Sequence, residues 1–146
     1  MTEKNKKSQN SKVGARGEKE AAKYLRKKGY KIVARNVHLT HGEIDIIARN
    51  SQYIVFVEVK TRADNDFLKR YGRPAKAVDA EKNRHLVSAA NEYLKNNKVT
   101  LLPRGDIVEV YVSEKGKLFK RKAYRFEHLT NTFGYINYHK HNKKYR

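Results

Sequence analysis

Two short segments of the chain combine the composition of buried β-strands with charged side chains that could do chemistry. Residues 42–47 and 55–60 are rich in Ile, Val and Phe and are flanked by polar residues, which is typical of strands. Asp45 interrupts the first segment. Glu58 and Lys60 interrupt the second, and they project together because residues two apart share a face of a strand. An unpaired buried charge costs roughly several kcal/mol, so a chain keeps one where a cation, a partner charge or a reaction requires it. Two carboxylates beside one lysine form the arrangement that metal-dependent phosphodiester cleavage needs.

A third carboxylate, Glu18, falls on the apolar side of a predicted helix. At 100° per residue it shares a stripe with Gly14, Ala21 and Leu25, so it faces the core. The structural alternative is a first-turn glutamate that the helix macrodipole stabilises. Gly14 and Gly17 are poor helix formers, but they would let this end of the helix approach a sheet or a ligand closely.

The charged residues of the two predicted strands could also have purely structural roles. Asp45 could end its strand in a pair with an arginine. Glu58 and Lys60 could form a solvent-facing ion pair, which typically contributes less than about 1 kcal/mol. Against this alternative, Ile54 and Phe56 share the face of Glu58 and Lys60, as expected where a strand runs from the core into a cleft.

The overall charge favours a polyanionic partner. The 146 residues include 34 Lys and Arg against 15 Asp and Glu, which gives a formal net charge of +19. Lys and Arg release counterions from phosphates, so nucleic acid is the leading candidate and an anionic membrane surface is the alternative. No apolar run approaches the roughly 20 residues of a spanning helix, and no secretory signal is visible. We therefore expect a cytoplasmic protein without a membrane partner. The absence of cysteine excludes disulfides and thiolate zinc sites.

Four basic residues are candidate phosphate contacts. Lys69, Arg70 and Arg73 lie in a polar loop before the second predicted helix, with Tyr71 available for base stacking. Lys82 falls within the buried stripe of that helix, where it either extends its amine to solvent or meets a phosphate. These residues do not decide between DNA and RNA, or between a monomer and a homodimer.

The chain is expected to form one domain with a basic arm at each end. Residues 1–12 are rich in Lys, Asn and Ser and are predicted to be disordered, residues 13–133 form the domain, and residues 134–146 form a basic, aromatic tail. The predicted elements are a helix at 13–28, strands at 30–36, 43–49 and 53–61, a helix at 74–96, and strands at 107–112 and 124–129, with a weaker edge strand at 118–122. The order α-β-β-β-α-β-β predicts an α/β fold with a mixed central sheet flanked by helices.

Several ordered motifs give the chain a resemblance to a known family. They are Gly14-x-x-Gly17-Glu18, Gly29-Tyr30, Arg35-Asn36, Gly42-Glu43-Ile44-Asp45, Val57-Glu58-Val59-Lys60, Pro74-x-x-Ala77-Val78 and Lys82. In order and spacing, over about residues 13–133, they resemble the YraN-like family of uncharacterised bacterial proteins. That family is similar to the restriction-endonuclease-like superfamily, whose active site has a PD-(D/E)xK pattern and whose fold archaeal Holliday-junction resolvases share. The resemblance implies that the catalytic helix Glu, Asp, Glu and Lys correspond to Glu18, Asp45, Glu58 and Lys60.

Residues and resemblance together favour a metal-dependent nuclease that hydrolyses phosphodiester bonds, in DNA rather than RNA and including branched or structured DNA. Asp45 and Glu58 are expected to bind Mg²⁺ or Mn²⁺ through carboxylate oxygens, and Glu18 to hold a second metal or a water. Lys60 would orient the attacking water or neutralise the transition state. Two alternatives stay open: a nucleic-acid-binding protein of the same fold that does not cut, and a structural or ribosome-associated protein that uses its charge alone.

Overall fold

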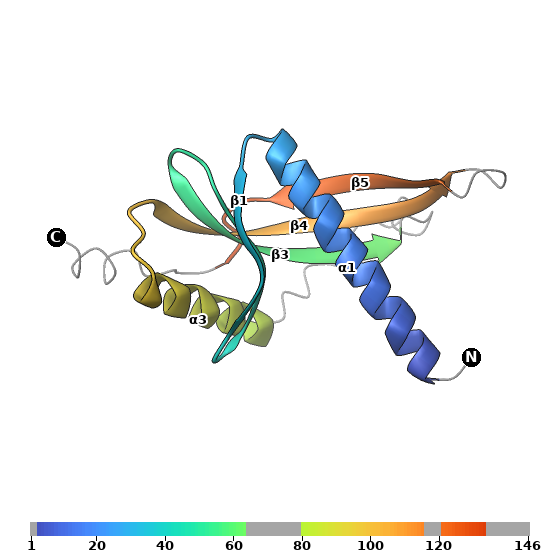
Figure 1. The fold of residues 1–146 in the computed structure, drawn as a ribbon, viewed down its shortest axis with the longest axis horizontal. Helices are drawn as coiled ribbons and strands as arrows, with labels where there is room; N and C mark the ends of the chain where they lie inside the picture. The colour runs from blue at the N-terminus through green and yellow to red at the C-terminus, as the bar shows by residue number, and fades with distance from the viewer. Residues whose placement is uncertain (1–2, 64–79, 116–120, 134–146) are drawn as a thin grey trace.

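The structure of the chain, a computed structural model, describes residues 3–63, 80–115 and 121–133 and is built on a five-stranded sheet (Figure 1). Its elements follow the order α-β-β-β-α-β-β, which confirms the predicted α/β class with a mixed sheet. Their bounds are α1 Glu3–Lys27, β1 Lys31–Leu39, β2 Gly42–Arg49, β3 Tyr53–Ala63, α3 Ala80–Asn96, β4 Leu102–Lys115 and β5 Arg121–Leu129.

Strand β3 is the centre of the sheet, whose strand order is β1-β2-β3-β4-β5. The pairs β1–β2, β2–β3 and β4–β5 are antiparallel, whereas β3 and β4 are parallel. Neighbouring parallel strands need a crossover connection, and α3 belongs to it. The β3–β4 pairing runs the length of β3, from Tyr53 with Leu102 to Ala63 with Val112. β3 and β4 therefore form an uninterrupted parallel pair through the middle of the sheet.

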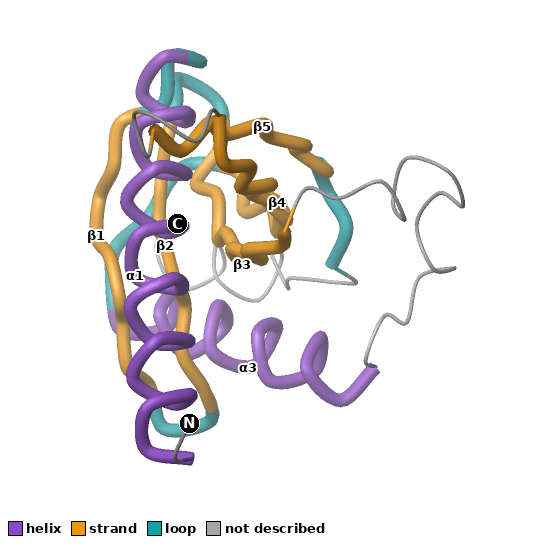
Figure 2. The backbone as a smooth tube through the Cα atoms, turned by 90° about the vertical axis from the view of Figure 1, so that its right-hand side faces the viewer, coloured by secondary structure: helices purple, strands orange, loops and turns teal. Residues whose placement is uncertain are grey.

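The two described helices cover opposite faces of the sheet. Along β3, Val55 and Val57 pack in one buried cluster with Leu25 of α1, and Ile54 and Phe56 pack in a second cluster with α3. This separation follows from the period of two in a strand, which sends successive side chains to opposite faces. Figure 2 shows α1 and α3 running crosswise to each other on different sides of the sheet. β3 is therefore buried on both faces over its first half.

Helix α1 ends where the sequence predicts, at a glycine in the left-handed region. Gly29 has φ +93°, and its N–H donates to the Arg26 carbonyl at 3.1 Å. The N–H of Tyr30 donates to the Leu25 carbonyl at 3.0 Å, which completes a Schellman motif. This cap turns the chain directly into β1.

The N-terminal arm differs from the expectation of disorder, because α1 begins at Glu3 and the backbone of residues 3–12 is helical. Lys, Glu and Gln are good helix formers, and extending an existing helix is much easier than nucleating one. The predicted strands at 118–122 and 124–129 are one strand in the described residues, β5, which starts at Arg121. Residues 62–63 belong to β3, while 64–79, including Pro74, and the tail at 134–146 lie outside the described residues. Neither described helix is long and apolar enough to cross a membrane.

Candidate functional site

Strands β2 and β3 part at Asp45, and this split is the centre of the candidate site. Their pairing covers only Ile46 with Val57 to Arg49 with Ile54, after which β2 stays paired with β1 and β3 stays paired with β4. Just beyond the last pair, Asp45 Oδ2 accepts the backbone N–H of Val59 at 2.8 Å. The Asp45 side chain thus accepts the hydrogen bond of a β3 backbone N–H at the point where the backbone pairing of β2 and β3 ends.

The regular alternation of side chains along β2 breaks at Asp45. Ile44 packs in the α3 cluster and Ile46 in the α1 cluster, although residues two apart in a regular strand share a face. On β1, Asn36 lies between the pairs that place Arg35 opposite Ile46 and Val37 opposite Ile44, and it has φ +50°. Asn is one of the few residues besides Gly that adopt this left-handed conformation readily.

Glu18 of α1 meets Asp45 at this point. Its carboxyl group is hydrogen-bonded to the side chains of Asn36 and Asp45 and lies in the field of Arg35. Burial raises the pKa of Glu18 above its ordinary value, and the negative charge of Asp45 raises it further; Arg35 and Asn36 act in the opposite direction. Two ionised carboxyl groups this close repel each other, and a shared proton, a metal cation or the charge of Arg35 would reduce that repulsion. Arg35 and Asn36 belong to a motif of the sequence resemblance, but no role was predicted for either.

A close approach at Gly17 brings Glu18 to the sheet. A Cβ atom built on Gly17 would lie 1.9 Å from Thr61 Oγ1, so only glycine allows α1 to pack this tightly on β3. This confirms the predicted close approach at Gly17. At Gly14, by contrast, such a Cβ would have no neighbour within 4 Å, and the prediction does not hold there.

Glu58 and Lys60 form a partly buried pair on the next strand. Lys60 Nζ lies 4.0 Å from Glu58 Oε1, and the two side chains are 28% and 16% exposed respectively. Neither side chain is therefore fully solvated, as a simple surface pair would be. Val57 and Val59 pack in the α1 cluster, so alternation assigns Glu58 and Lys60 to the other face, with Phe56.

The described contacts join the four predicted catalytic residues as two separate pairs, one approached by α1 and one on the face of β3 that Phe56 shares. Glu18 contacts Asp45, Lys60 contacts Glu58, and the N–H of Val59, which lies between Glu58 and Lys60 in the chain, binds Asp45. Among the described side chains, no three His, Asp or Glu residues form a group that could hold a metal ion. The convergence of all four groups around one cleft, with three carboxylates on a metal, stays a prediction.

The predicted phosphate contacts fall largely outside what the structure describes. Lys69, Arg70 and Arg73 lie in the segment 64–79, which is outside the described residues. Lys82 lies near the start of α3, and its side chain is likewise outside the described part. Their roles stay predictions.

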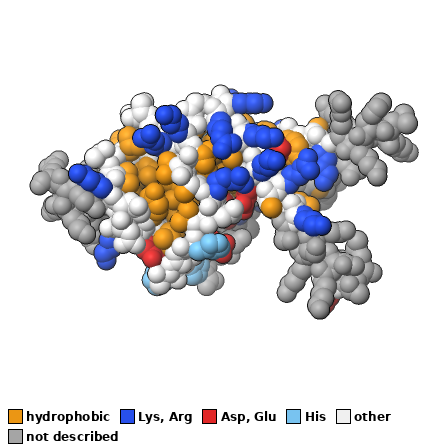
Figure 3. Space-filling model, viewed as in Figure 1, with side chains coloured by type: hydrophobic (Ala, Val, Ile, Leu, Met, Phe, Trp, Pro, Cys, Tyr) orange, Lys and Arg blue, Asp and Glu red, His pale blue; other side chains and the backbone are white. Residues whose placement is uncertain are grey.

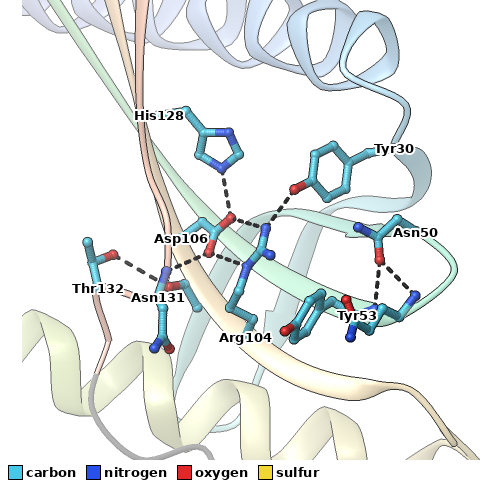
Figure 4. Close-up of polar contacts among 10 residues, drawn as sticks. Tyr30, Asn50, Tyr53, Arg104, Asp106, His128, Asn131 and Thr132 are labelled. Atoms are coloured by element: carbon cyan, nitrogen blue, oxygen red, sulfur yellow. Dashed lines mark hydrogen bonds and ion pairs between the residues drawn. The ribbon is translucent and has the colours of Figure 1, made fainter.

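A fully buried carboxylate elsewhere in the fold, Asp106 of β4, was not predicted from the sequence. It is fully buried and accepts hydrogen bonds from Arg104 Nε at 2.9 Å, from Arg104 Nη2 at 2.8 Å and from the N–H of Asn131 at 3.0 Å (Figure 4). His128 Nε2 lies 2.7 Å from the same carboxylate. Burial alone would raise the pKa of Asp106, but the bonds from His128, Arg104 and Asn131 outweigh burial and hold it below its ordinary value.

The same network connects distant parts of the fold. Arg104 Nη2 donates to the Tyr30 hydroxyl at 2.7 Å, and its guanidinium carbon lies 4.7 Å from the centre of the Tyr53 ring. The network thus links the start of β4 to the α1–β1 junction, to β3 and to the end of β5. Because its charges are matched within the network, we assign Asp106 a structural role. The only signal in the sequence was the Arg-x-Asp spacing, which places both side chains on one face of a strand.

Comparisons with known proteins agree on one family. The model of the uncharacterised protein family UPF0102 matches residues 17–110. A UPF0102 protein of Caldanaerobacter subterraneus is 45% identical over 122 residues, covering 83% of this chain and 93% of the relative. One from Clostridioides difficile is 38% identical over 125 residues, covering 85% and 98%. One from Pseudothermotoga lettingae is 48% identical over 100 residues, covering 68% and 86%. These matches confirm the YraN-like family resemblance, and the chain belongs to the UPF0102 family.

Proposed function

We propose that this protein is a metal-dependent nuclease that hydrolyses phosphodiester bonds in DNA, including branched or structured DNA. The observation that supports it most is the contact between the Glu18 and Asp45 carboxyl groups at the split between β2 and β3. Two ionised carboxyl groups repel each other, and a divalent cation between them would reduce that repulsion further than Arg35 does from beside Glu18. The Glu58–Lys60 pair follows immediately along β3.

The donor set suits a hard divalent cation. Asp45, Glu58 and Glu18 offer only carboxylate oxygens, which are the ligands of Mg²⁺ and Mn²⁺. Asp45 raises the pKa of Glu18, so a cation bound between the two carboxyl groups would favour their ionised forms. When bound, the metal would lower the pKa of a water molecule and stabilise charge on the phosphate.

Lys60 would act through its positive charge. Its ammonium group is held beside Glu58 and is 28% exposed, so it can meet solvent or substrate. Near the scissile phosphate, it would neutralise the charge that develops in the transition state or orient the attacking water. Lys60 is not a metal ligand, and its removal should leave metal affinity largely intact.

The net charge of +19 supports a nucleic-acid substrate. DNA is proposed over RNA from the resemblance to the restriction-endonuclease-like superfamily and the archaeal Holliday-junction resolvases. A cytoplasmic location belongs to the same proposal, which fits a monomer or a homodimer equally.

A nucleic-acid-binding protein that does not cut is the second candidate. It is favoured by the lack, among the described side chains, of any three acidic or histidine residues grouped to hold a metal. In that case the basic surface would bind the nucleic acid, and the Glu18–Asp45 pair would have no catalytic role.

The test is a cleavage assay with branched, single-stranded and duplex DNA in Mg²⁺ or Mn²⁺. The wild type should cut at least one substrate, whereas Lys60→Ala and Glu58→Gln should not. Glu43→Gln is the matched control for Glu58→Gln, because Glu43 is an exposed carboxylate of β2 that pairs with His38 at 3.0 Å. It should cut as the wild type does. A wild type that cuts none of the substrates would replace the enzyme proposal with the binding one.

A further inference from the structure

A basic pocket lies between the N-terminal half of α1 and the paired strands β4 and β5. Its volume is about 240 Å³, and its walls include Lys12, Arg16 and Lys122 beside Val13, Val112 and Tyr124. No acidic side chain is among the described residues that line it. We infer that this pocket, which has no part in the chemistry proposed above, binds a backbone phosphate of a polynucleotide. The inference rests on the proposed function only in its choice of nucleic acid as partner.

The close approach at Gly17 explains why a pocket forms here. Gly17 is buried and packs on Thr61, which fixes α1 against β3 at this point. Toward its N-terminus, α1 leaves the sheet: Val13 is 46% exposed, and a Cβ on Gly14 would meet nothing within 4 Å. Figure 1 shows this half of α1 running past the edge of the sheet. The space between the departing helix and the strands is the pocket.

Arg16 is held in place for anion binding. Its Nε donates to the Tyr124 hydroxyl at 2.9 Å, so the guanidinium is anchored across the pocket. No carboxylate whose side chain the structure describes pairs with it. The remaining guanidinium N–H groups form the planar fork that binds phosphate oxygens in pairs. Because this fork is held by Tyr124, less side-chain entropy is lost on binding.

The surroundings of Arg16 add further positive charge. Lys12 is one helical turn earlier, on the same face of α1, and Lys122 approaches from β5. Figure 3 shows Lys and Arg side chains gathered on the face of the molecule that α1 covers. Three cations around one concave site create the field that concentrates an anion.

The size of the pocket favours one phosphodiester group over a whole cofactor. Its volume of about 240 Å³ is below the roughly 300–1,000 Å³ of typical small-molecule sites. Its place in the fold also fits a nucleic-acid backbone. Gly17 lines the pocket and precedes Glu18, which contacts Asp45. A phosphate bound here would therefore anchor the strand on the α1 side of the sheet, near Glu18.

The test measures the affinity of the full chain for labelled duplex DNA by fluorescence anisotropy, without divalent metal, over a range of salt concentrations. Arg16→Gln and Lys122→Gln should each weaken binding about tenfold at low salt. Each should also reduce the log–log salt slope by about 0.9, the value for one lost phosphate contact. Tyr124→Phe keeps the charge but releases Arg16, so it should weaken binding less and leave the slope unchanged.

Lys98→Gln is the matched control, because Lys98 is exposed in the segment after α3, the helix on the opposite face of the sheet. It removes the same charge and should leave the slope at the wild-type value. Circular dichroism spectra of all variants establish that they are folded. If Arg16→Gln and Lys122→Gln lower affinity no more than Lys98→Gln, the pocket inference is overturned. The nuclease proposal is then tested by the cleavage assay alone. If the pocket variants lose affinity but the wild type never cuts, the pocket stands and the nuclease fails.

Discussion

Removal of the Asp106 carboxylate should destabilise the fold far more than removal of an exposed one. In Asp106→Ala, Arg104 would keep its charge without its partner, and its side chain is only 14% exposed. The N–H of Asn131 would lose its acceptor, and His128 would lose its contact with the carboxylate. Breaking a buried ion pair by removing one member costs about 3–5 kcal/mol. For a domain of this size each kcal/mol lowers Tm by about 2–4 °C, so the fall should be about 6–20 °C.

The matched control is Glu127→Ala on β5. Glu127 pairs with Arg125 at 3.0 Å, and the two side chains are 39% and 47% exposed. An exposed pair of this kind contributes less than about 1 kcal/mol, so its loss should lower Tm by about 4 °C or less. Both values come from thermal unfolding at pH 7. If the two substitutions lower Tm equally, the Asp106 network does not stabilise the fold as we argue.

The pH dependence offers an independent check on Asp106. Its pKa in the folded protein lies below the ordinary value of 3.8, so its ionised form stabilises the fold. That stability is present above about pH 4 and is lost as pH falls through the folded-state pKa. The difference in stability between wild type and Asp106→Asn should therefore narrow in strong acid. A difference that is constant from pH 7 down to pH 2 would contradict the assignment.

Three further perturbations test the site and its surface. Gly17→Ala should lower the free energy of unfolding, measured with a chemical denaturant, by about 1–3 kcal/mol, because the added Cβ meets Thr61. Gly14→Ala should raise it by up to about 1 kcal/mol through helix propensity. Equal effects of the two substitutions would disprove the close approach. Burial, and then the charge of Asp45, raises the pKa of Glu18, so the ionised form of Glu18 destabilises the fold. The loss of folding stability develops as pH rises from 4.5 through the folded-state pKa. Glu18→Gln should therefore be at least as stable as wild type at pH 8, with the gain absent below pH 4.5; lower stability at pH 8 would refute this. DNA affinity should fall linearly on log–log axes with salt, at about −0.9 per neutralised phosphate, and a flat response would exclude charge-driven binding.

The sequence predicted the elements whose signals are local. The Ile- and Val-rich segments around Asp45 and Glu58 are β2 and β3, Gly29 ends α1, and α3 ends at Asn96. Each of these depends on composition or on a single capping residue, so a local pattern is enough to find it. The α-β-β-β-α-β-β order followed from the same signals.

The sequence did not predict features that depend on distant partners. Asp106 meets His128, and Arg104 meets Tyr30, across separations of 22 and 74 residues, and no local pattern gives such pairings. The change of face between Ile44 and Ile46 lies opposite Asn36, whose left-handed conformation no local pattern predicts. The phosphate pocket requires α1 to leave the sheet beyond its contact with β3. These are consequences of packing, and they needed the structure.

Titration of Mn²⁺ over wild type and Asp45→Asn, with DNA cleavage and DNA binding measured in the same samples, tests the central claim most directly. Asp45 contacts Glu18 and binds the N–H of Val59 at 2.8 Å, so its charge is central to the site. We predict that wild type cuts in proportion to metal occupancy. Asp45→Asn, purified identically as the control for contaminating nuclease, should not cut. It should bind DNA as tightly as wild type or more tightly, because a negative charge that repels phosphate is gone. Equal cleavage by the two proteins, or none by either, would contradict the account.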